Sequence, residues 1–573
     1  MLMNGAGIIM EALHREGVEV IFGYPGGANM PIYDVLYDHP VRHILMRHEE
    51  NACFAAEGYA RSTGKVGVCF ATSGPGATNL VTGLVDALMD SIPVVAITGQ
   101  VPRAMIGRDA FQEADVFGIT RSTTKHNYLV KDVNDLARTI HEAFHIASTG
   151  RPGPVLIDVT KDVQNAKAAY HAPGPVHLRG YKVSLEGHAG QIRRAVEMIW
   201  ASQRPYVYAG GGIVTSGASA ELCELAEILE APVAETLMGL GSLASEHPYC
   251  INMLGMHGSY AANMGISDAD LLIALGVRFD DRVTGRLEAF ARHAKVIHVD
   301  IDPAEIGKNR SVELPIVGDL KHVLRRLNDL LGETRSTDGA RNAGARRQWM
   351  DQIRDWQRQH PFSYAPSDTE IKPQYLVEMM DQFCQGRTIV AADVGQHQMW
   401  GAQYIRFNQP RLWLCSGGLG AMGFGLPAAI GAQLGNPDKP VFALVGDGGF
   451  MMSLPELSTI ASYGLPIKIV VMNNGYLGMV RQWQELFNSR RYSAVELDCF
   501  PHAERLGEAF GIRARTVDKP QHLAQALREA LEEPGPYLLN VKVSPEENVY
   551  PMIPSGGAVN EMILEPPQPV EAA

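Results

Sequence analysis

Short apolar runs alternate with amphipathic stretches along most of this chain. Helix-like segments separate β-rich runs from Gly5 to about Thr160, and the same alternation returns over residues 204–302 and again from Lys372. This alternation predicts mostly parallel sheets covered by helices on both faces, which is an α/β fold. The length of 573 residues is enough for about three or four such domains.

Two polar segments interrupt the alternation. Residues 164–190 are rich in Pro, Gly and His and lack periodicity, and residues 334–366 are densely charged. We interpret both as linkers, the second containing one solvated helix. The expected domains therefore span residues 1–165, 190–335 and 370–550, followed by a C-terminal tail at 551–573.

Residues 441–474 place polar side chains directly after two apolar runs. The runs Val441–Val445 and Ile467–Met472 predict buried parallel strands, and Asp447 and Asn474 follow them. Both side chains should lie at one sheet edge, where α/β proteins bind ligands. Carboxylate, amide and carbonyl oxygens suit Mg²⁺, and the flanking glycines leave room for a diphosphate. Taken alone, GDG and NN are also ordinary turn sequences.

Composition excludes several classes of partner and site. Fifty Lys and Arg against 63 Asp and Glu give a net charge of −13, with no long basic block. Nucleic acid and anionic membranes are therefore poor candidates as partners. The seven cysteines form no C-x-x-C pair, which argues against a disulfide framework and a zinc site. No signal peptide and no 18-residue apolar run is visible, so we expect a cytoplasmic protein.

Several motifs together give the chain a family resemblance. GDGG and NN at their observed spacing resemble the diphosphate-binding motif of thiamine diphosphate enzymes. Together with RHE (47–49), TSGPGATN (72–79), DSIPVVAITGQ (90–100) and GRDAFQEADVFGITR (107–121), the chain resembles the catalytic subunit of the acetohydroxyacid synthase, or acetolactate synthase, family. The resemblance implies three doubly wound parallel-sheet domains that bind the cofactor's pyrimidine, FAD, and the diphosphate with Mg²⁺, in that order.

The resemblance also implies three sets of binding residues. The metal would be held by Asp447, Asn474 and the Tyr476 carbonyl. Thiamine diphosphate would contact Gly26, Pro75, Asn79, Gln396, His397, Gly420, Met422, Gly446 and Gly448, with Met422 wedged between its two rings. FAD would contact Arg151, Gly211, Gly212, Met256, His257, Gly258, Arg278, Asp300 and Asp319. No G-x-G-x-x-G fingerprint occurs within residues 204–302, so FAD rests on the resemblance.

Six further residues would serve the reaction. Under the resemblance, Glu49 protonates the cofactor's pyrimidine, and Phe111 and Gln112 reach the reaction centre of a neighbouring subunit. Lys161 would lie at the substrate entrance, Arg282 would bind a 2-keto acid's carboxylate, and Trp483 would favour a larger second substrate. Four of the six have a structural alternative: a helix N-terminal acid for Glu49, a surface ion pair for Arg282, and core packing for Phe111 and Trp483.

The implied reaction is decarboxylation of pyruvate and transfer of the hydroxyethyl group to a second 2-keto acid. Pyruvate as acceptor gives 2-acetolactate, and 2-ketobutyrate gives 2-aceto-2-hydroxybutyrate, for branched-chain amino-acid synthesis. FAD would have no net redox role. Sites shared between subunits imply a homodimer or higher homo-oligomer, to which a small regulatory subunit could bind. The alternatives are a pyruvate oxidase, a flavin-free acetolactate synthase, or an inactive cofactor-binding protein.

Overall fold

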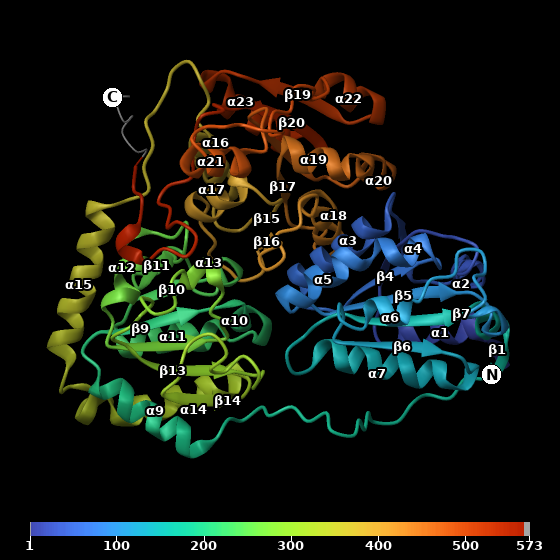
Figure 1. Cartoon of the computed structure of the whole chain (residues 1–573), viewed down its shortest axis with the longest axis horizontal. Coiled ribbons are helices and arrows are strands. Elements are labelled where there is room, and N and C mark those ends of the chain that lie inside the picture. The colour runs from blue at the N-terminus through green and yellow to red at the C-terminus, as the bar shows by residue number, and fades with distance from the viewer. Residues whose placement is uncertain (1, 566–573) are drawn as a thin grey trace.

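The computed structural model describes residues 2–565 and contains three six-stranded parallel sheets, each with helices on both faces (Figure 1). The prediction of three parallel-sheet α/β domains is confirmed. The N-terminal domain lies on the right of Figure 1, the central domain at the lower left, and the C-terminal domain above both. The last residues of the expected tail, 566–573, lie outside the described residues.

The N-terminal sheet has the strand order β3-β2-β4-β5-β7-β6. Its strands are β2 (Val20–Gly23), β3 (Arg42–Leu45), β4 (Gly67–Ala71), β5 (Val94–Gln100), β6 (His126–Val130) and β7 (Val155–Thr160). The helices are α1 (Gly5–Arg15), α2 (Met30–Leu36), α3 (Glu49–Thr63), α4 (Pro75–Asn79), α5 (Val81–Asp90), α6 (Val116–Thr120), α7 (Leu136–Ser148) and α8 (Lys161–Asn165). Most strands are buried throughout, which explains why they read as continuous apolar runs.

The C-terminal sheet repeats this relative order as β16-β15-β17-β18-β20-β19. Its strands are β15 (Ile389–Ala392), β16 (Trp413–Cys415), β17 (Val441–Gly446), β18 (Lys468–Asn473), β19 (Arg513–Val517) and β20 (Tyr537–Lys542). The helices are α16 (Pro373–Cys384), α17 (Gln396–Tyr404), α18 (Gly425–Gly435), α19 (Asp447–Ser453), α20 (Leu457–Tyr463), α21 (Gly478–Phe487), α22 (Ala503–Phe510) and α23 (Pro520–Glu532). The N- and C-terminal domains are therefore two versions of one topology.

The central sheet differs, with the order β11-β10-β9-β12-β13-β14. Numbered from its own first strand this is 3-2-1-4-5-6, the order of dinucleotide-binding domains. Its strands are β9 (Pro205–Ala209), β10 (Val233–Glu235), β11 (Cys250–Met253), β12 (Leu271–Leu275), β13 (Lys295–Asp300) and β14 (Leu314–Val317). The helices are α9 (Ala189–Ala201), α10 (Gly211–Ser216), α11 (Ser219–Leu229), α12 (Tyr260–Asp268), α13 (Asp281–Thr284), α14 (Leu320–Thr334) and α15 (Ala343–Gln359).

Both expected linkers contain more structure than their composition suggested. Residues of the first form β8 (Lys167–Ala169), which pairs antiparallel with β1 (Leu2–Asn4) and ties the chain's start to the end of its first domain. In the second, α15 is not simply solvated, because Trp349 and Ile353 are buried against the central domain. The Trp349 indole donates a hydrogen bond to the Pro205 carbonyl at 3.1 Å.

The N- and C-terminal domains meet where α3 packs against α18 (Figure 1). Small residues allow the two helix backbones to approach closely. A Cβ atom on Gly58 would lie 2.1 Å from the Ala428 carbonyl oxygen, and one on Gly431 would lie 1.8 Å from the Ala55 carbonyl oxygen. Neither obstacle is a flexible side chain, so the helices themselves would have to separate.

Replacing Gly431 by alanine should therefore destabilise the protein by about 3 kcal/mol, through overpacking between two backbones. Gly332→Ala is the matched control, because Gly332 is an exposed position of α14 with no atom within 4 Å of an added Cβ. That change should stabilise by about 0.5 kcal/mol, since alanine favours helix. Thermal unfolding of both variants measures the contrast, and equal midpoints would contradict the close helix contact.

Candidate active site

A cavity of about 910 Å³ lies between the three domains. The central and C-terminal domains supply most of its lining, and the N-terminal domain contributes residues 89–91 and 145–152. Ligands of α/β sheets bind where the strand order reverses, at the carboxyl ends of the strands. The cavity reaches that edge in both sheets, because it is lined by Gly211 and Arg278, which follow strands of the central sheet, and by Gln396 and Asp447, which follow strands of the C-terminal sheet.

Asp447 and Asn474 lie at one edge, as their spacing predicts. Gly446 at the end of β17 pairs with Met472 of the neighbouring strand β18. The Asp447 carboxylate accepts hydrogen bonds from the backbone N–H groups of Gly475 at 2.8 Å and Gly448 at 3.0 Å. Asp447, Asn474 and Tyr476 all line the cavity. The oxygen donors that would suit Mg²⁺ are therefore assembled there, and their role as metal ligands stays a prediction.

The neighbouring turn has the properties of a diphosphate cradle. A Cβ atom on Gly446 would lie 2.9 Å from the His397 ring, and one on Gly448 would lie 2.8 Å from the Leu477 side chain. His397 is buried, and its Nε2 atom has no hydrogen-bond partner within the described residues. Burial lowers the pKa of His397 to about 4, so the ring is neutral. An unpaired ring nitrogen beside glycines that leave open space fits a bound polar group.

Met422 is held in place by a buried carboxylate that sequence reasoning missed. Asp393 accepts hydrogen bonds from the backbone N–H groups of Val394, Gly423 and Gly425, at 2.7 to 3.1 Å. These bonds fix the turn on which Met422 projects into the cavity beside Gly420. Asp393 directly follows strand β15, and that position was the available sequence signal.

The central domain carries a second group of close backbone contacts. A Cβ atom on Gly210 would lie 2.2 Å from the Gly276 carbonyl oxygen, so the turns after β9 and β12 touch. Their cavity-lining neighbours include the predicted Arg151, Gly211, Gly212, Met256, His257, Arg278, Asp300 and Asp319. Gly258 lies in the adjoining tight turn, where a Cβ atom would meet Leu254, and it does not line the cavity.

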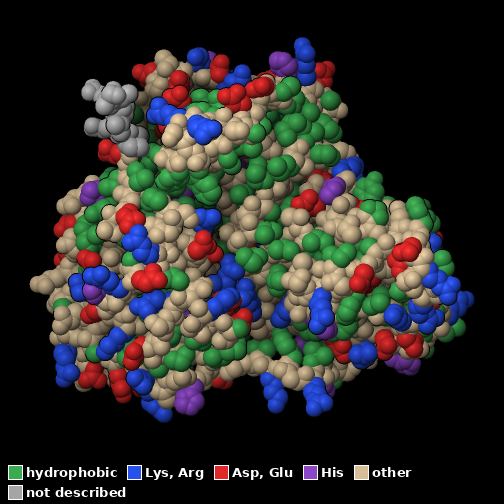
Figure 2. Space-filling view, in the orientation of Figure 1, with side chains coloured by type: hydrophobic (Ala, Val, Ile, Leu, Met, Phe, Trp, Pro, Cys, Tyr) green, Lys and Arg blue, Asp and Glu red, His purple; other side chains and the backbone are tan. Residues whose placement is uncertain are grey.

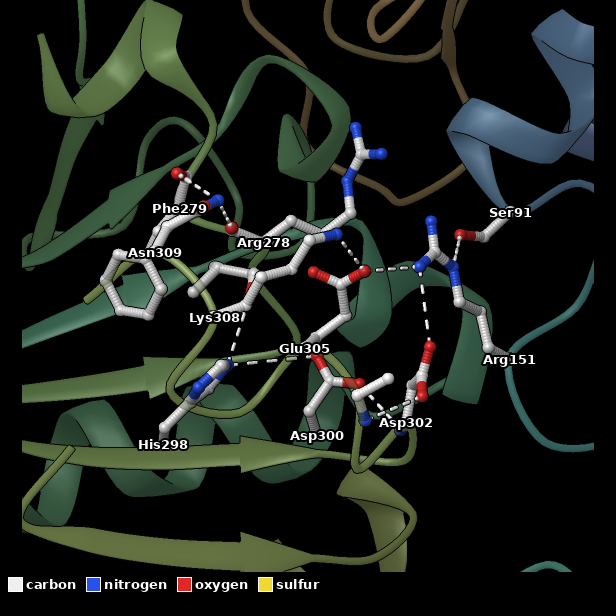
Figure 3. A network of polar contacts seen from close by, with 12 residues as sticks. Ser91, Arg151, Arg278, Phe279, His298, Asp300, Asp302, Glu305, Lys308 and Asn309 are labelled. Carbon is white, nitrogen blue, oxygen red and sulfur yellow. Dashed lines mark hydrogen bonds and ion pairs between the residues drawn. The ribbon is translucent and has the colours of Figure 1, made fainter. Parts of the chain in front are cut away.

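Polar contacts join the N-terminal and central domains at this end of the cavity (Figure 3). The Arg151 guanidinium forms an ion pair of 2.6 Å with Glu305 and donates to the Ser91 hydroxyl at 2.9 Å. Glu305 is buried and also pairs with Lys308 at 3.2 Å. Arg278 points away from these carboxylates in Figure 3. The network therefore aligns the two domains and leaves the Arg278 guanidinium for another partner.

The hollow between these two domains is rich in cations. Figure 2 shows Lys and Arg side chains gathered there. A second cavity of about 510 Å³ continues from the first and is lined by Lys125, Arg151, Arg278 and Lys308, together with three carboxylates. Burial lowers the pKa of Lys125 to about 8. An anionic ligand would meet favourable charge along this route.

Arg282 and Trp483 meet across the domain boundary. The Arg282 guanidinium lies 5.6 Å from the centre of the Trp483 ring, within the range of a cation–π contact. Within residues 2–565, no ion pair joins Arg282 to Asp280 or Asp281. Trp483 is 37% exposed, so it is not a core residue. Both side chains line the cavity, where a carboxylate could bind the guanidinium.

A separate cluster of predicted residues lies on the N-terminal domain and does not line this cavity. Glu49 is the first residue of α3, and its carboxylate accepts a hydrogen bond of 2.9 Å from the Asn79 side chain. An added Cβ on Gly76, which follows Pro75, would lie 3.2 Å from Glu49 Oε1. The other predicted site residues on this domain are Gly26, Pro75, Phe111, Gln112 and Lys161.

The exposure of this cluster is informative. Phe111 is 88% exposed, which excludes core packing within one chain. Gln112 has a positive φ of 58° and packs its backbone against Gly74. Lys161 begins α8. One chain therefore carries two groups of predicted site residues, and only the group on the central and C-terminal domains lines the cavity.

Sequence reasoning also missed a contribution from the first linker. Tyr181, Val183 and Leu185 line the large cavity. The Tyr181 hydroxyl donates to the Thr149 carbonyl at 2.8 Å, which anchors the linker beside Arg151. Alternation of apolar residues at every second position of an otherwise polar segment was the available signal.

Comparison with known proteins identifies the class. Three thiamine pyrophosphate enzyme models match: the N-terminal TPP binding domain at residues 3–119, the central domain at 192–327, and the C-terminal TPP binding domain at 393–541. The chain belongs to the thiamine pyrophosphate enzymes, in agreement with its three sheets and its cavity.

Curated relatives narrow the class to a family. The chain is 49% identical to acetolactate synthase 3, chloroplastic, of Brassica napus over 98% of this chain and 87% of the relative. It is 49% identical to the chloroplastic acetolactate synthase of Arabidopsis thaliana, covering 98% and 84%, and 47% identical to acetolactate synthase of Arthrospira platensis, covering 98% of both. Within the class, the chain belongs to the acetolactate synthase family, which confirms the resemblance seen in the sequence.

The electrostatics of Asp447 give a testable pH dependence. Burial raises its pKa to about 6, although hydrogen bonds from backbone N–H groups oppose the shift. The protonated carboxyl cannot bind a cation, so Mg²⁺ affinity should be constant above about pH 7 and fall about tenfold per pH unit below pH 6. Mg²⁺ titrations with thiamine diphosphate, followed by protein fluorescence, measure this dependence.

The control is the pH dependence of Mg²⁺ binding to free thiamine diphosphate, which removes the cofactor's own titration. If the protein adds no further pH dependence between about pH 7 and pH 5, Asp447 is not the metal ligand.

Proposed function

We propose that this chain catalyses the acetolactate synthase reaction, in which pyruvate loses CO₂ and the remaining two-carbon unit is joined to a second 2-keto acid. The observation that carries the proposal is the single cavity that contains Asp447, Asn474, Met422, Arg282 and Trp483, in a chain that belongs to this family. The second substrate would be pyruvate or 2-ketobutyrate. The N-terminal, central and C-terminal domains would bind pyrimidine, FAD and diphosphate, respectively.

The cofactor's diphosphate would lie in the turn of Gly446 and Gly448, beside the unpaired His397 nitrogen. Mg²⁺ would be held by Asp447, Asn474 and the Tyr476 carbonyl, which form an all-oxygen donor set. When bound, thiamine diphosphate supplies the nucleophilic carbon and the electron sink that decarboxylation of a 2-keto acid requires. Met422, fixed through Asp393, would set the bend between its rings.

Arg282 and Trp483 would select and orient the second substrate. Arg282 has no carboxylate partner within the described residues, so its guanidinium can bind the carboxylate of a 2-keto acid. The Trp483 ring holds that guanidinium from one face and offers an apolar wall to the substrate's alkyl group. A positioned acceptor in a site that excludes water favours carbon–carbon bond formation over protonation.

Glu49 would exchange a proton with the pyrimidine ring. Its carboxylate is held by the Asn79 amide, which fixes one oxygen and leaves the other available. Because Glu49, Phe111 and Gln112 lie outside the cavity of their own chain, a second copy would supply them. We therefore propose a homodimer or higher homo-oligomer, each site combining the N-terminal domain of one chain with the C-terminal domain of the other.

FAD is the proposed ligand of the central domain. Support comes from its 3-2-1-4-5-6 strand order, from the touching glycine turns after β9 and β12, and from the acidic Asp300 at the end of β13. The acidic residue would bind a ribose hydroxyl, and Arg278 would bind the pyrophosphate. No helix among the described residues is long and apolar enough to span a membrane. The cytoplasmic location and a small regulatory subunit stay predictions.

The decisive assay is anaerobic incubation of the purified protein with pyruvate, thiamine diphosphate, Mg²⁺ and FAD. Acetolactate should accumulate, detected as acetoin after acid treatment, while the flavin absorbance remains that of the oxidised form. Protein without Mg²⁺ is the control and should form little product. Flavin bleaching without acetolactate would instead indicate an oxidase and would overturn the roles proposed for Arg282 and Trp483.

A further inference from the structure

A buried carboxylate of the C-terminal domain contacts the segment that carries Glu49. Glu456 lies in the short turn at Leu454–Glu456 between α19 and α20, and it has no exposed surface. One of its oxygens accepts hydrogen bonds of 2.9 Å from both the Arg47 backbone N–H and the Asn51 side chain. The other oxygen accepts a hydrogen bond of 2.6 Å from the Thr459 hydroxyl. Two of the three donors therefore come from the N-terminal domain.

These two donors bracket Glu49 in the chain. Arg47 lies two residues before it and Asn51 two residues after it, and α3 begins at Glu49 itself. A single acceptor oxygen thus fixes both the entry into the helix and its first turn. A backbone N–H at this point has no intrahelical partner, so an acceptor from another domain supplies one.

Neighbouring bonds dock the same segment against α20. The Arg47 side chain donates to the Ser458 hydroxyl at 3.0 Å, and the Leu45 backbone N–H donates to the Tyr463 hydroxyl at 2.9 Å. Strand β3 is the edge strand of its sheet, so its outer backbone groups are free to make these contacts. The end of β3 and the start of α3 are therefore held by the C-terminal domain.

Burying the Glu456 carboxylate to make these hydrogen bonds is energetically unfavourable. The carboxylate forms no direct ion pair within the described residues, although the charge of the nearby Arg47 guanidinium favours the ionised carboxylate, and burial of a carboxylate without a direct ion pair is unfavourable. Desolvation raises its pKa, and the three hydrogen bonds oppose this shift. A buried carboxylate that accepts bonds from another domain points to a positional role at the segment that it holds.

We propose that Glu456 is a positioning residue that sets the location of Glu49. Asp447, the candidate metal ligand, is the first residue of α19, and Glu456 ends the short turn that follows this helix, so one continuous segment connects both candidate functional groups of the chain. Loss of the Glu456 acceptor would let the start of α3 move, and displacement by about 1 Å can cost about 100-fold in rate. The inference rests on the proposed role of Glu49.

The test measures hydrogen–deuterium exchange at the C2 position of thiamine diphosphate bound to the full-length protein, which depends on the proton function proposed for Glu49 and needs no substrate. Glu456→Leu removes the acceptor and should slow exchange about 10- to 100-fold. Glu456→Gln keeps an acceptor oxygen and should restore the rate to within about threefold. Mg²⁺ affinity should stay within about twofold in both variants.

Matched variants separate positioning from a general loss of structure. Thr459→Val removes a hydrogen bond from the other oxygen of Glu456 and should leave exchange nearly unchanged. Asn51→Ala removes one bond from the α3 side and should slow exchange, which keeps the test available if Glu456→Leu does not fold. In the cofactor-free protein, amide exchange in the peptide 45–53 should be faster in Glu456→Leu than in Thr459→Val.

Glu49→Gln provides the reference. If Glu456 acts only through Glu49, the double variant should be no slower than Glu49→Gln alone. Wild-type exchange in Glu456→Leu beside slow exchange in Glu49→Gln would overturn the positioning role and leave the proposed function intact. Additive losses in the double variant would also overturn it. Wild-type exchange in Glu49→Gln would refute the proposed role of Glu49, and with it this inference.

Discussion

The contact between α3 and α18 is the constraint on which the rest of this structure depends. Glycines at Gly58 and Gly431 allow the two helix backbones to touch, which fixes the N-terminal domain against the C-terminal domain. Helix α3 begins with Glu49, and α18 follows the turn that carries Met422. One helix pair therefore determines where two groups of candidate site residues lie, and it keeps them apart within the chain.

Buried carboxylates fix the turns around this contact. Asp393 holds the Met422 turn, and Glu456 holds the approach to Glu49. A third group joins Arg61 of α3 to Asp86 and Asp90 of α5, and Asp90 accepts the backbone N–H groups of Gly417 and Gly418 in the C-terminal domain. Backbone N–H groups in tight turns lack regular partners, so carboxylates that accept several of them give these turns a unique geometry.

The sequence alone predicted which residues lie together where a physical rule relates a local pattern to a position in the fold. Carboxyl ends of adjacent parallel strands share an edge, so Asp447 and Asn474 could be placed together from two apolar runs. No such rule predicts a hydrogen bond between Arg47 and Glu456, which are 409 residues apart. The strand order of the central sheet was equally hidden, because alternation of strands and helices is the same in every doubly wound fold.

Local amino-acid composition predicted burial and exposure less well than strand position predicted the site. Tyr181 belongs to a polar segment that looks like a simple linker, yet it lines the cavity because it anchors beside Thr149. Helix α15 is strongly charged, and the helical spacing of Trp349, Met350, Ile353 and Trp356 was the indication of a buried face. Exposure of Phe111 was expected only from the family resemblance and not from its residue type, since an aromatic residue usually packs in its own core.

Each active site is proposed to combine residues from two copies of the chain, and mixing two inactive variants tests this arrangement most directly. Glu49→Gln and Asp447→Asn each disable a different group of residues, so a mixed dimer should contain one intact site. Differently tagged variants, unfolded and reassembled together or co-expressed, should recover about a quarter of wild-type acetolactate synthesis at equal mixing. Mixed dimers isolated through both tags that remain as inactive as either variant would contradict the account.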